Sequence, residues 1–138
     1  LTVLVVAGRN DELQERLNRR ALHSRQRLRI WGYTDQVYLL MLAADLVITK
    51  PGALTLSEAY ALGVPLLLHE PIPGPETQNA RYAAEHGAAV WAKGDIGKVV
   101  REVFFDSEKL AAMQQAALKL SRPDAADTIA EKIYLALG

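Results

Sequence analysis

A short segment near the middle of the chain carries residue types that can bind an anion. Lys50 and Gly52 follow an apolar run, and Thr55 lies three residues beyond Gly52. If a helix begins at Ala53, its first backbone N–H groups are unpaired, and the positive end of its dipole attracts phosphate. Gly52 has no side chain to keep a ligand from the backbone. One interpretation of this turn is therefore a phosphate site.

Thr55 and Glu58 permit two interpretations of the helix that follows. Glu58 lies one turn further along, where its carboxylate could accept hydrogen bonds from the hydroxyls of a ribose. Alternatively, the Thr-x-x-Glu spacing is a capping box, in which both side chains satisfy only the N–H groups of their own helix. The segment by itself leaves both interpretations open.

Two further loops carry polar residues directly after apolar runs. Arg9 could bind phosphate through two parallel hydrogen bonds, and Asn10 follows it at the start of a helical pattern. Tyr33 and Thr34 could hold a planar base, with the backbone of Thr34 pairing to the polar edge of that base. The alternatives are an exposed turn residue at Arg9, a plain helix cap at Asn10 and a half-buried core aromatic at Tyr33.

The Pro/Gly-rich loop 69–78 carries several polar side chains that could bind the hydroxyls of a sugar. Glu76, Gln78 and Asn79 are the candidates; alternatively, Glu76 only begins the next helix, with Gln78 and Asn79 exposed in its first turn. His69 suits acid–base work near neutral pH, although a single histidine at a strand end is more often structural. The sequence contains no Ser/His/Asp set, P-loop motif or His/Cys metal cluster.

The elements that must position these residues follow an alternating order of strands and helices. Continuous apolar runs predict strands that are buried on both faces, and amphipathic segments separate them. We expect strands at 2–7, 28–31, 46–48, 64–68 and 88–91, and helices at 11–22, 37–44, 54–62, 76–86, 96–105, 107–120 and 125–137. This order predicts an α/β fold, a Rossmann-like doubly wound parallel sheet with helices on both faces. Ligands of such sheets bind beyond the carboxyl ends of the strands, so the polar loops should line one crevice.

Composition bounds the class of protein. The 138 residues predict one domain, and 16 basic against 16 acidic side chains argue against non-specific binding of nucleic acid. An arginine cluster at 16–29 is either a solvated face or a contact with anionic lipid headgroups. No cysteine is present, and no apolar run approaches the roughly 18 residues of a membrane-spanning helix. Because the chain begins at Leu1 within an apolar run, we expect a fragment or an excised domain.

The motifs as a whole resemble a known family. The matching segments are Gly8–Asn10, Gly32–Asp35, Ala44–Gly52, Leu54–Ala59, Pro71–Gly74 and Asn79–Tyr82. They span most of the chain in the order found in the C-terminal half of GT-B glycosyltransferases, of the type that includes monogalactosyldiacylglycerol synthase and the processive diacylglycerol glucosyltransferases. The transferase that adds N-acetylglucosamine to make lipid II is a more distant relative.

The resemblance implies a UDP-sugar donor bound without a metal or other cofactor. By position, the backbone at Thr34 would contact uracil, the turn from Gly52 to Thr55 the diphosphate, Glu58 the ribose and the segment 76–79 the sugar. The donor-binding residues expected on this basis are Arg9, Asn10, Tyr33, Thr34, Lys50, Gly52, Ala53, Leu54, Thr55, Glu58, Glu76, Gln78 and Asn79. Relatives often read Pro-Gly-Gln-Glu where this chain has Pro73-Gly74-Pro75-Glu76, so a glutamine that would contact the donor is missing, and Gln78 could compensate.

The expected function is the donor-binding domain of an inverting glycosyltransferase that moves a hexose to a lipid, diacylglycerol, at the cytoplasmic face of the membrane. The acceptor site, the catalytic base and the first Gly-rich βα unit would lie outside this sequence, so the chain alone would be inactive. The alternatives are a transferase or epimerase of the same fold that uses UDP-N-acetylglucosamine, and a non-catalytic nucleotide-binding module.

Overall fold

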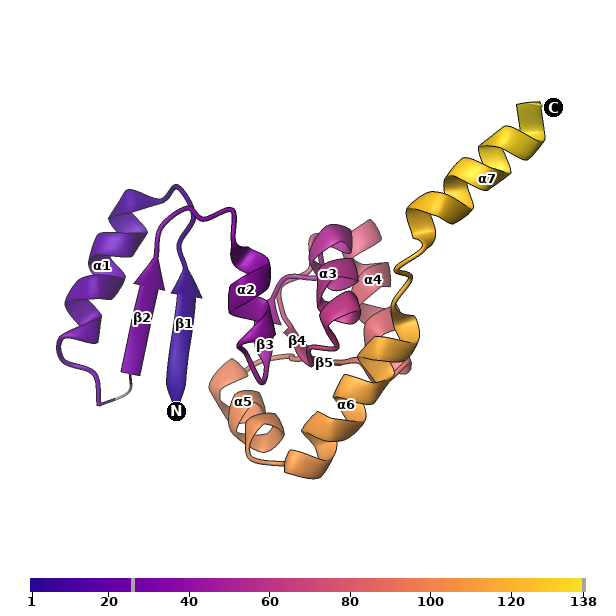
Figure 1. Cartoon of the computed structure of the whole chain (residues 1–138). Coiled ribbons are helices and arrows are strands. Elements are labelled where there is room, and N and C mark those ends of the chain that lie inside the picture. The colour runs from indigo at the N-terminus through magenta and orange to yellow at the C-terminus, as the bar shows by residue number, and fades with distance from the viewer. Residues whose placement is uncertain (26, 138) are drawn as a thin grey trace. The chain divides into compact units, whose positions relative to one another are not determined.

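The computed structural model describes residues 1–25 and 27–137 and divides the chain into two compact units, Leu1–Leu40 and Met41–Gly138. The elements in chain order are β1 (Thr2–Val6), α1 (Asp11–Ala21), β2 (Arg27–Trp31), α2 (Val37–Leu42), β3 (Val47–Thr49), α3 (Ala53–Leu62), β4 (Leu66–Leu68), α4 (Pro75–Glu85), β5 (Ala89–Trp91), α5 (Ile96–Phe104), α6 (Ser107–Leu120) and α7 (Ala125–Leu137) (Figure 1).

The first unit contains a two-stranded parallel sheet and a helix. β1 pairs with β2 from Thr2 opposite Arg27 to Val6 opposite Trp31, and α1 packs against β2. The connection between β1 and α1 is a tight turn in which Gly8 has φ 63°, a left-handed conformation that favours glycine. This turn brings the chain directly from the end of β1 to the start of α1.

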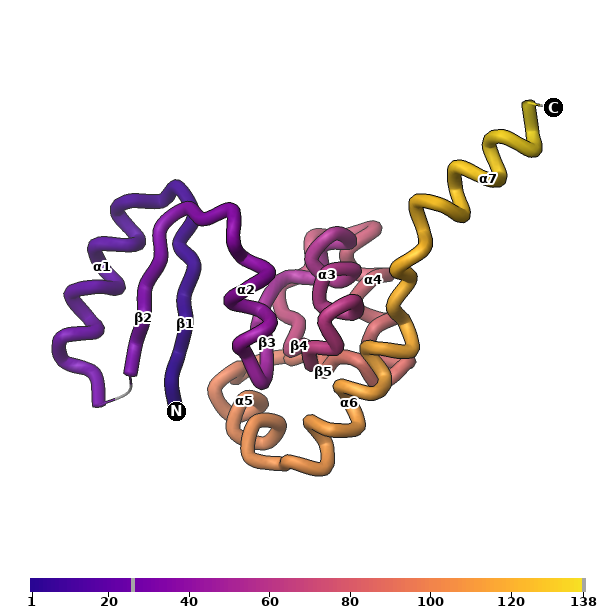
Figure 2. Tube along the Cα trace, viewed as in Figure 1, coloured from indigo at the N-terminus to yellow at the C-terminus, as the bar shows by residue number. Residues whose placement is uncertain are grey.

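The second unit contains a three-stranded parallel sheet in the order β3-β4-β5. Leu66, Leu67 and Leu68 of the central strand β4 have no exposed surface, which explains why this strand is a continuous apolar run. α4 packs against β5, and α3 packs against α6. The Cα trace runs from β3 through α3 to β4, so the turn before α3 lies at the carboxyl end of β3 (Figure 2).

The α/β class with parallel strands flanked by helices is confirmed, and every predicted strand and helix is present. The boundaries differ by one or two residues: α3 begins at Ala53 rather than Leu54, and α4 begins at Pro75 rather than Glu76. β4 begins only at Leu66 because Pro65 has no N–H to donate to a neighbouring strand. A single domain with one continuous sheet stays a prediction.

Gly63 and Gly87 follow the ends of α3 and α4, with φ of 65° and 75°. α3 ends at Leu62 as predicted, α4 ends at Glu85, one residue before the predicted end, and the left-handed glycine after each helix stops it. None of the helices described for residues 1–25 and 27–137 is long and apolar enough to cross a membrane.

Candidate functional site

The turn between β3 and α3 presents unpaired backbone N–H groups. Gly52 is the N-cap of α3 in an extended conformation, its own N–H donates to the Lys50 carbonyl at 2.9 Å, and no side chain caps the helix. The first N–H groups of a helix have no acceptor within the helix, which applies here to Ala53, Leu54 and Thr55. Together with the helix dipole, these groups make the start of α3 suitable for an anion.

The capping-box interpretation of Thr55 and Glu58 is wrong. With Gly52 as N-cap, Thr55 is the third residue of α3 and Glu58 lies in its second turn. Neither side chain makes a hydrogen bond to any described residue, whereas the neighbouring Ser57 donates its Oγ to the Ala53 carbonyl at 3.0 Å. Thr55 is half-buried and Glu58 is exposed, so both side chains remain available to a ligand.

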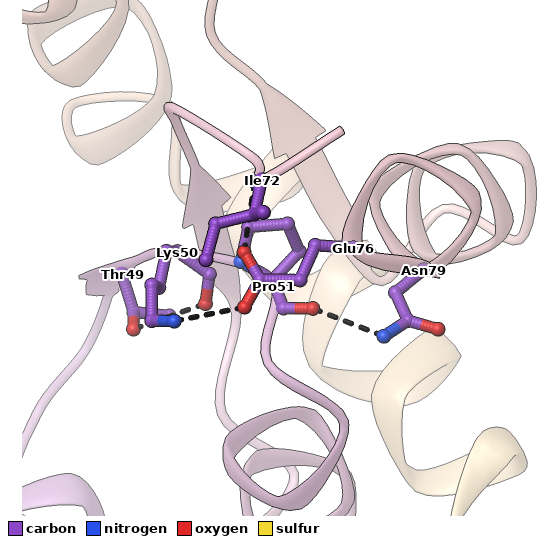
Figure 3. A network of polar contacts seen from close by, with 6 residues as sticks. All are labelled: Thr49, Lys50, Pro51, Ile72, Glu76 and Asn79. Atoms are coloured by element: carbon purple, nitrogen blue, oxygen red, sulfur yellow. Dashed lines mark hydrogen bonds and ion pairs between the residues drawn. The ribbon is translucent and has the colours of Figure 1, made fainter. Parts of the chain in front are cut away.

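A second feature of this turn is an ion pair between Lys50 and Glu76. Lys50 Nζ lies 2.8 Å from Glu76 Oε1, and the other carboxylate oxygen, Oε2, accepts a hydrogen bond from the Ile72 N–H at 3.0 Å (Figure 3). The Lys50 side chain is 58% exposed, whereas that of Glu76 is only 15% exposed. The hydrogen bonds from Lys50 and then from Ile72 lower the pKa of Glu76 below 4.5, despite the opposing effect of desolvation. Glu76 is therefore a carboxylate whose two oxygens are both already paired.

Asn79 joins α4 to the same turn. Its Nδ2 donates to the Pro51 carbonyl at 3.1 Å (Figure 3), and Pro51 itself is fully buried. Asn79 is half-buried, so the alternative of an exposed residue in the first turn of α4 is wrong for Asn79 but holds for Gln78. Residues three apart on a helix lie on the same face, which explains why Glu76 and Asn79 both reach the turn.

Sequence reasoning missed the backbone partners of these side chains, the Ile72 N–H and the Pro51 carbonyl. The spacing of Glu76 and Asn79 was a signal that both face one way. It could not reveal what they face, because Pro51 is 28 residues from Asn79 along the chain.

In the first unit, Arg9 and Tyr33 lie together, with the guanidinium carbon 4.7 Å from the centre of the Tyr33 ring. Tyr33 is 66% exposed, so its interpretation as a half-buried core aromatic is wrong. Asn10 is the predicted helix cap, since its Oδ1 accepts from the Leu13 N–H at 2.9 Å. The Nδ2 group of Asn10 makes no hydrogen bond with other described residues and can donate to a ligand.

The side chain of Thr34 forms a hydrogen bond, whereas its backbone forms none with other described residues. Its Oγ1 accepts from the Gln36 N–H at 3.1 Å, which shapes the turn before α2. Its backbone N–H and carbonyl make no hydrogen bond with other described residues. These are the groups that the sequence predicts to pair with a base, and that role stays a prediction.

His69 lies at the carboxyl end of β4, where its N–H donates to the Thr49 carbonyl at 3.1 Å. Its Nδ1 is 3.9 Å from Glu70 Oε2, which is too long for a hydrogen bond, and is buried without a partner among the described residues. Nothing at His69 supplies the arrangement of a general base. Within residues 1–25 and 27–137, no three His, Asp or Glu side chains gather where they could hold a metal ion.

Comparison with known proteins adds to this geometry. Residues 1–129 match the glycosyltransferase family 28 C-terminal domain. The chain is 38% identical over 135 residues to a processive diacylglycerol beta-glucosyltransferase of Bacillus cytotoxicus, a match that covers 96% of this chain and 35% of that protein. The enzyme of the same name from Bacillus pumilus is 38% identical over 133 residues, with 95% and 35% covered. The chain thus spans about a third of the length of these curated relatives.

Among solved structures, the crystal structure of MurG from Acinetobacter baumannii resembles this chain with a TM-score of 0.67 and 22% identity, over 97% of this chain and 49% of MurG. At this identity the likeness concerns the fold alone, and it agrees with the predicted fold class. The family resemblance expected from the motifs is confirmed by the domain match and by the relatives. The chain belongs to the glycosyltransferase family 28 C-terminal domain family.

Proposed function

We propose that this chain is the UDP-sugar-binding domain of an inverting glycosyltransferase that transfers a hexose to diacylglycerol. The observation that carries the proposal is the uncapped start of α3 after Gly52, in a chain of this family. The names of the relatives, which are diacylglycerol glucosyltransferases, support a glucose donor and a lipid acceptor.

The diphosphate, the ribose and the sugar of the donor each have a proposed partner in the second unit. The diphosphate binds the N–H groups of Ala53, Leu54 and Thr55, with the Thr55 hydroxyl and Lys50 beside them. The Glu58 carboxylate accepts hydrogen bonds from the ribose hydroxyls, because it lies one turn beyond the diphosphate. The sugar lies near the segment 76–79, where Glu76, Gln78 and Asn79 are placed at the start of α4.

The proposed partners in the first unit are the backbone of Thr34 for the polar edge of uracil and the exposed Tyr33 ring for its face. Arg9 supplies a positive charge for the phosphates, and Asn10 supplies its remaining amide group. The arginines of 16–29 would rest against anionic lipid at the cytoplasmic membrane face.

Catalysis in this proposal rests on electrostatic stabilisation of the leaving UDP. The helix N–H groups and the cations Arg9 and Lys50 neutralise the charge that develops on the diphosphate, without a metal. The acceptor site and the base that activates the acceptor hydroxyl belong to the part of the protein outside this sequence. The chain alone would therefore bind UDP and transfer nothing.

Calorimetric titration of the chain with UDP and UMP tests the donor site. We expect UDP to bind at least tenfold more tightly than UMP, and Glu58→Ala to weaken UDP binding about tenfold, the effect of losing hydrogen bonds to a charged group. Ser57→Ala is the matched control, because the Ser57 hydroxyl already bonds to the Ala53 carbonyl. Equal affinity for UDP and UMP, together with an unaffected Glu58→Ala variant, would refute the donor site.

The substrate is tested with the full-length protein. Assays with UDP-glucose and UDP-galactose on diacylglycerol vesicles should give transfer of glucose with inversion at the anomeric carbon. Activity with UDP-N-acetylglucosamine in place of these donors would support the alternative of a different transferase of the same fold.

A further inference from the structure

The free chain holds Glu76, a residue proposed to lie near the donor sugar, with both carboxylate oxygens occupied. Oε1 pairs with Lys50 at 2.8 Å, and Oε2 accepts from the Ile72 N–H at 3.0 Å. Each oxygen of Glu76 therefore already has one partner, and a sugar hydroxyl that approaches Oε1 competes with Lys50 for it. Lys50 is the partner able to leave, because its side chain is flexible and exposed, whereas the Ile72 N–H belongs to the backbone.

We propose that the Lys50–Glu76 ion pair is exchanged when the donor binds: the diphosphate replaces Glu76 as the partner of Lys50, and Glu76 Oε1 is released to accept a hydrogen bond from the sugar. This inference rests on the proposed function. It assigns to Lys50 and Glu76 a coupling between recognition of the diphosphate and recognition of the sugar.

The position of Lys50 supports the exchange. Lys50 precedes Gly52 by two residues, and the Gly52 N–H bonds to the Lys50 carbonyl, so the lysine is anchored beside the unpaired N–H groups of α3. A diphosphate bound there carries more negative charge than one carboxylate and offers more acceptor oxygens to the three donors of the ammonium group. The Lys50 side of this ion pair is 58% exposed, and water weakens the attraction of an exposed cation, so the diphosphate can displace the carboxylate.

Glu76 keeps its place after the exchange. The Ile72 N–H still holds Oε2, and the rotation of Glu76 is limited because its side chain is largely buried at the start of α4. Oε1 then becomes an acceptor that is oriented and unpaired, next to the bound diphosphate. Glu76 therefore binds the sugar better once the diphosphate has taken Lys50.

The exchange predicts that one mutation at the site strengthens UDP binding instead of weakening it. Because the Glu76 carboxylate competes with the diphosphate for Lys50 and also repels it, Glu76→Gln should bind UDP about three- to tenfold more tightly than the unaltered chain. The same variant should lose part of the preference for UDP-glucose over UDP, since it has no carboxylate for the sugar. Lys50→Met should weaken UDP binding, and in the Lys50→Met background Glu76→Gln should give no gain.

Calorimetry of the four chains with UDP and UDP-glucose measures these effects, and thermal denaturation verifies that each variant folds. Glu70→Gln is the matched control: Glu70 lies six residues before Glu76 and carries the same charge, but its side chain is 87% exposed and its Oε2 lies 3.9 Å from His69 Nδ1. Among the described residues, Glu70 forms no ion pair with Lys50. We expect Glu70→Gln to change UDP affinity by less than twofold.

The exchange is overturned if Glu76→Gln binds UDP no more tightly than the unaltered chain, if Glu70→Gln gains as much, or if the gain persists with Lys50→Met. In each of these cases UDP still binds and the proposed donor site stands. If neither the unaltered chain nor Glu76→Gln binds UDP, the proposed function itself fails and the exchange fails with it.

Discussion

At the scale of single residues, the Tyr60 hydroxyl is a buried polar group without a hydrogen-bond partner among the described residues. Tyr60 is 8% exposed on the inner side of α3. Burial first, and the interaction with Tyr82 second, raise the pKa of Tyr60 to about 12. Burial of a hydroxyl without a hydrogen-bond partner destabilises the folded chain, because the hydroxyl loses its hydrogen bonds to water and gains none in the protein.

We therefore expect Tyr60→Phe to leave the free energy of unfolding unchanged or to raise it by up to about 1 kcal/mol, measured by urea denaturation at pH 7. In alkaline solution the free energies of unfolding of the unaltered chain and of Tyr60→Phe should diverge. An unfolded tyrosine ionises near pH 10 and Tyr60 in the folded chain near 12, so the unaltered chain keeps its full stability below pH 10 and loses part of it between pH 10 and 12.

Tyr60→Phe should lack this alkaline loss. Tyr38→Phe, at an exposed tyrosine, is the control and should retain it. Destabilisation of Tyr60→Phe by more than about 1 kcal/mol would mean that the hydroxyl has a partner in solution.

The sequence could suggest which residues belong to the candidate site, but it could not predict the contacts that these residues make. A lysine, a glycine and a helix start in order suggested an anion site, although a capping box at Thr55 and Glu58 was the alternative. The Asn79 contact with the Pro51 carbonyl joins positions 28 residues apart, and only the packing of α4 beside the β3–α3 turn creates it. Tyr33 shows the same limit, because hydrophobicity alone could not tell an exposed ring beside Arg9 from a core aromatic.

At the scale of elements, the strands and helices followed from local patterns. The apolar run of β4 predicted a strand buried on both faces, and the predicted ends of the helices 54–62 and 76–86 fall directly before Gly63 and Gly87, which are left-handed. The start of α3 was less certain, because a threonine followed by a glutamate three residues later is also a helix-start signal. Gly52 is the N-cap instead, which leaves Thr55 and Glu58 to the ligand.

The two helix-ending glycines differ in their surroundings and so predict different costs. A Cβ at Gly63 would lie 2.9 Å from Cγ and Cδ2 of Leu118, in the contact between α3 and α6, whereas a Cβ at Gly87 would meet only the Ala116 Cβ at an ordinary 3.7 Å. Both residues are left-handed, which costs any alanine about 1 kcal/mol or more.

We expect Gly63→Ala to lower the free energy of unfolding by roughly 2–4 kcal/mol and Gly87→Ala by only about 1 kcal/mol, measured by urea denaturation. Since both variants share the cost of the left-handed conformation, the difference between their losses of free energy of unfolding measures the packing of α3 on α6. Equal losses would show that Leu118 moves aside without cost.

At the scale of the whole molecule, the core is concentrated in one part of the chain. All the buried apolar side chains of the described residues lie between Met41 and Ala117, and none lies in the first unit. The predictions of a single domain, one continuous sheet and one crevice belong to this scale. Chain order could suggest them, but strand pairing is set by long-range packing, and the pairs described are β1 with β2 and β3-β4-β5.

The helix α7 contrasts with this core, because every residue from Ala125 to Leu137 is exposed, including Ile129 and Ile133. A helix that buries no residue contributes little to the stability of the unit that carries it. We therefore expect a chain that ends at Asp124 to have the same free energy of unfolding as the 138-residue chain, within about 0.5 kcal/mol, measured by thermal or urea denaturation. Met113→Ala is the control, since Met113 is 4% exposed on α6 and its truncation should cost about 2–5 kcal/mol. A loss on truncation as large as that of Met113→Ala would mean that the apolar face of α7 is packed against other residues in solution.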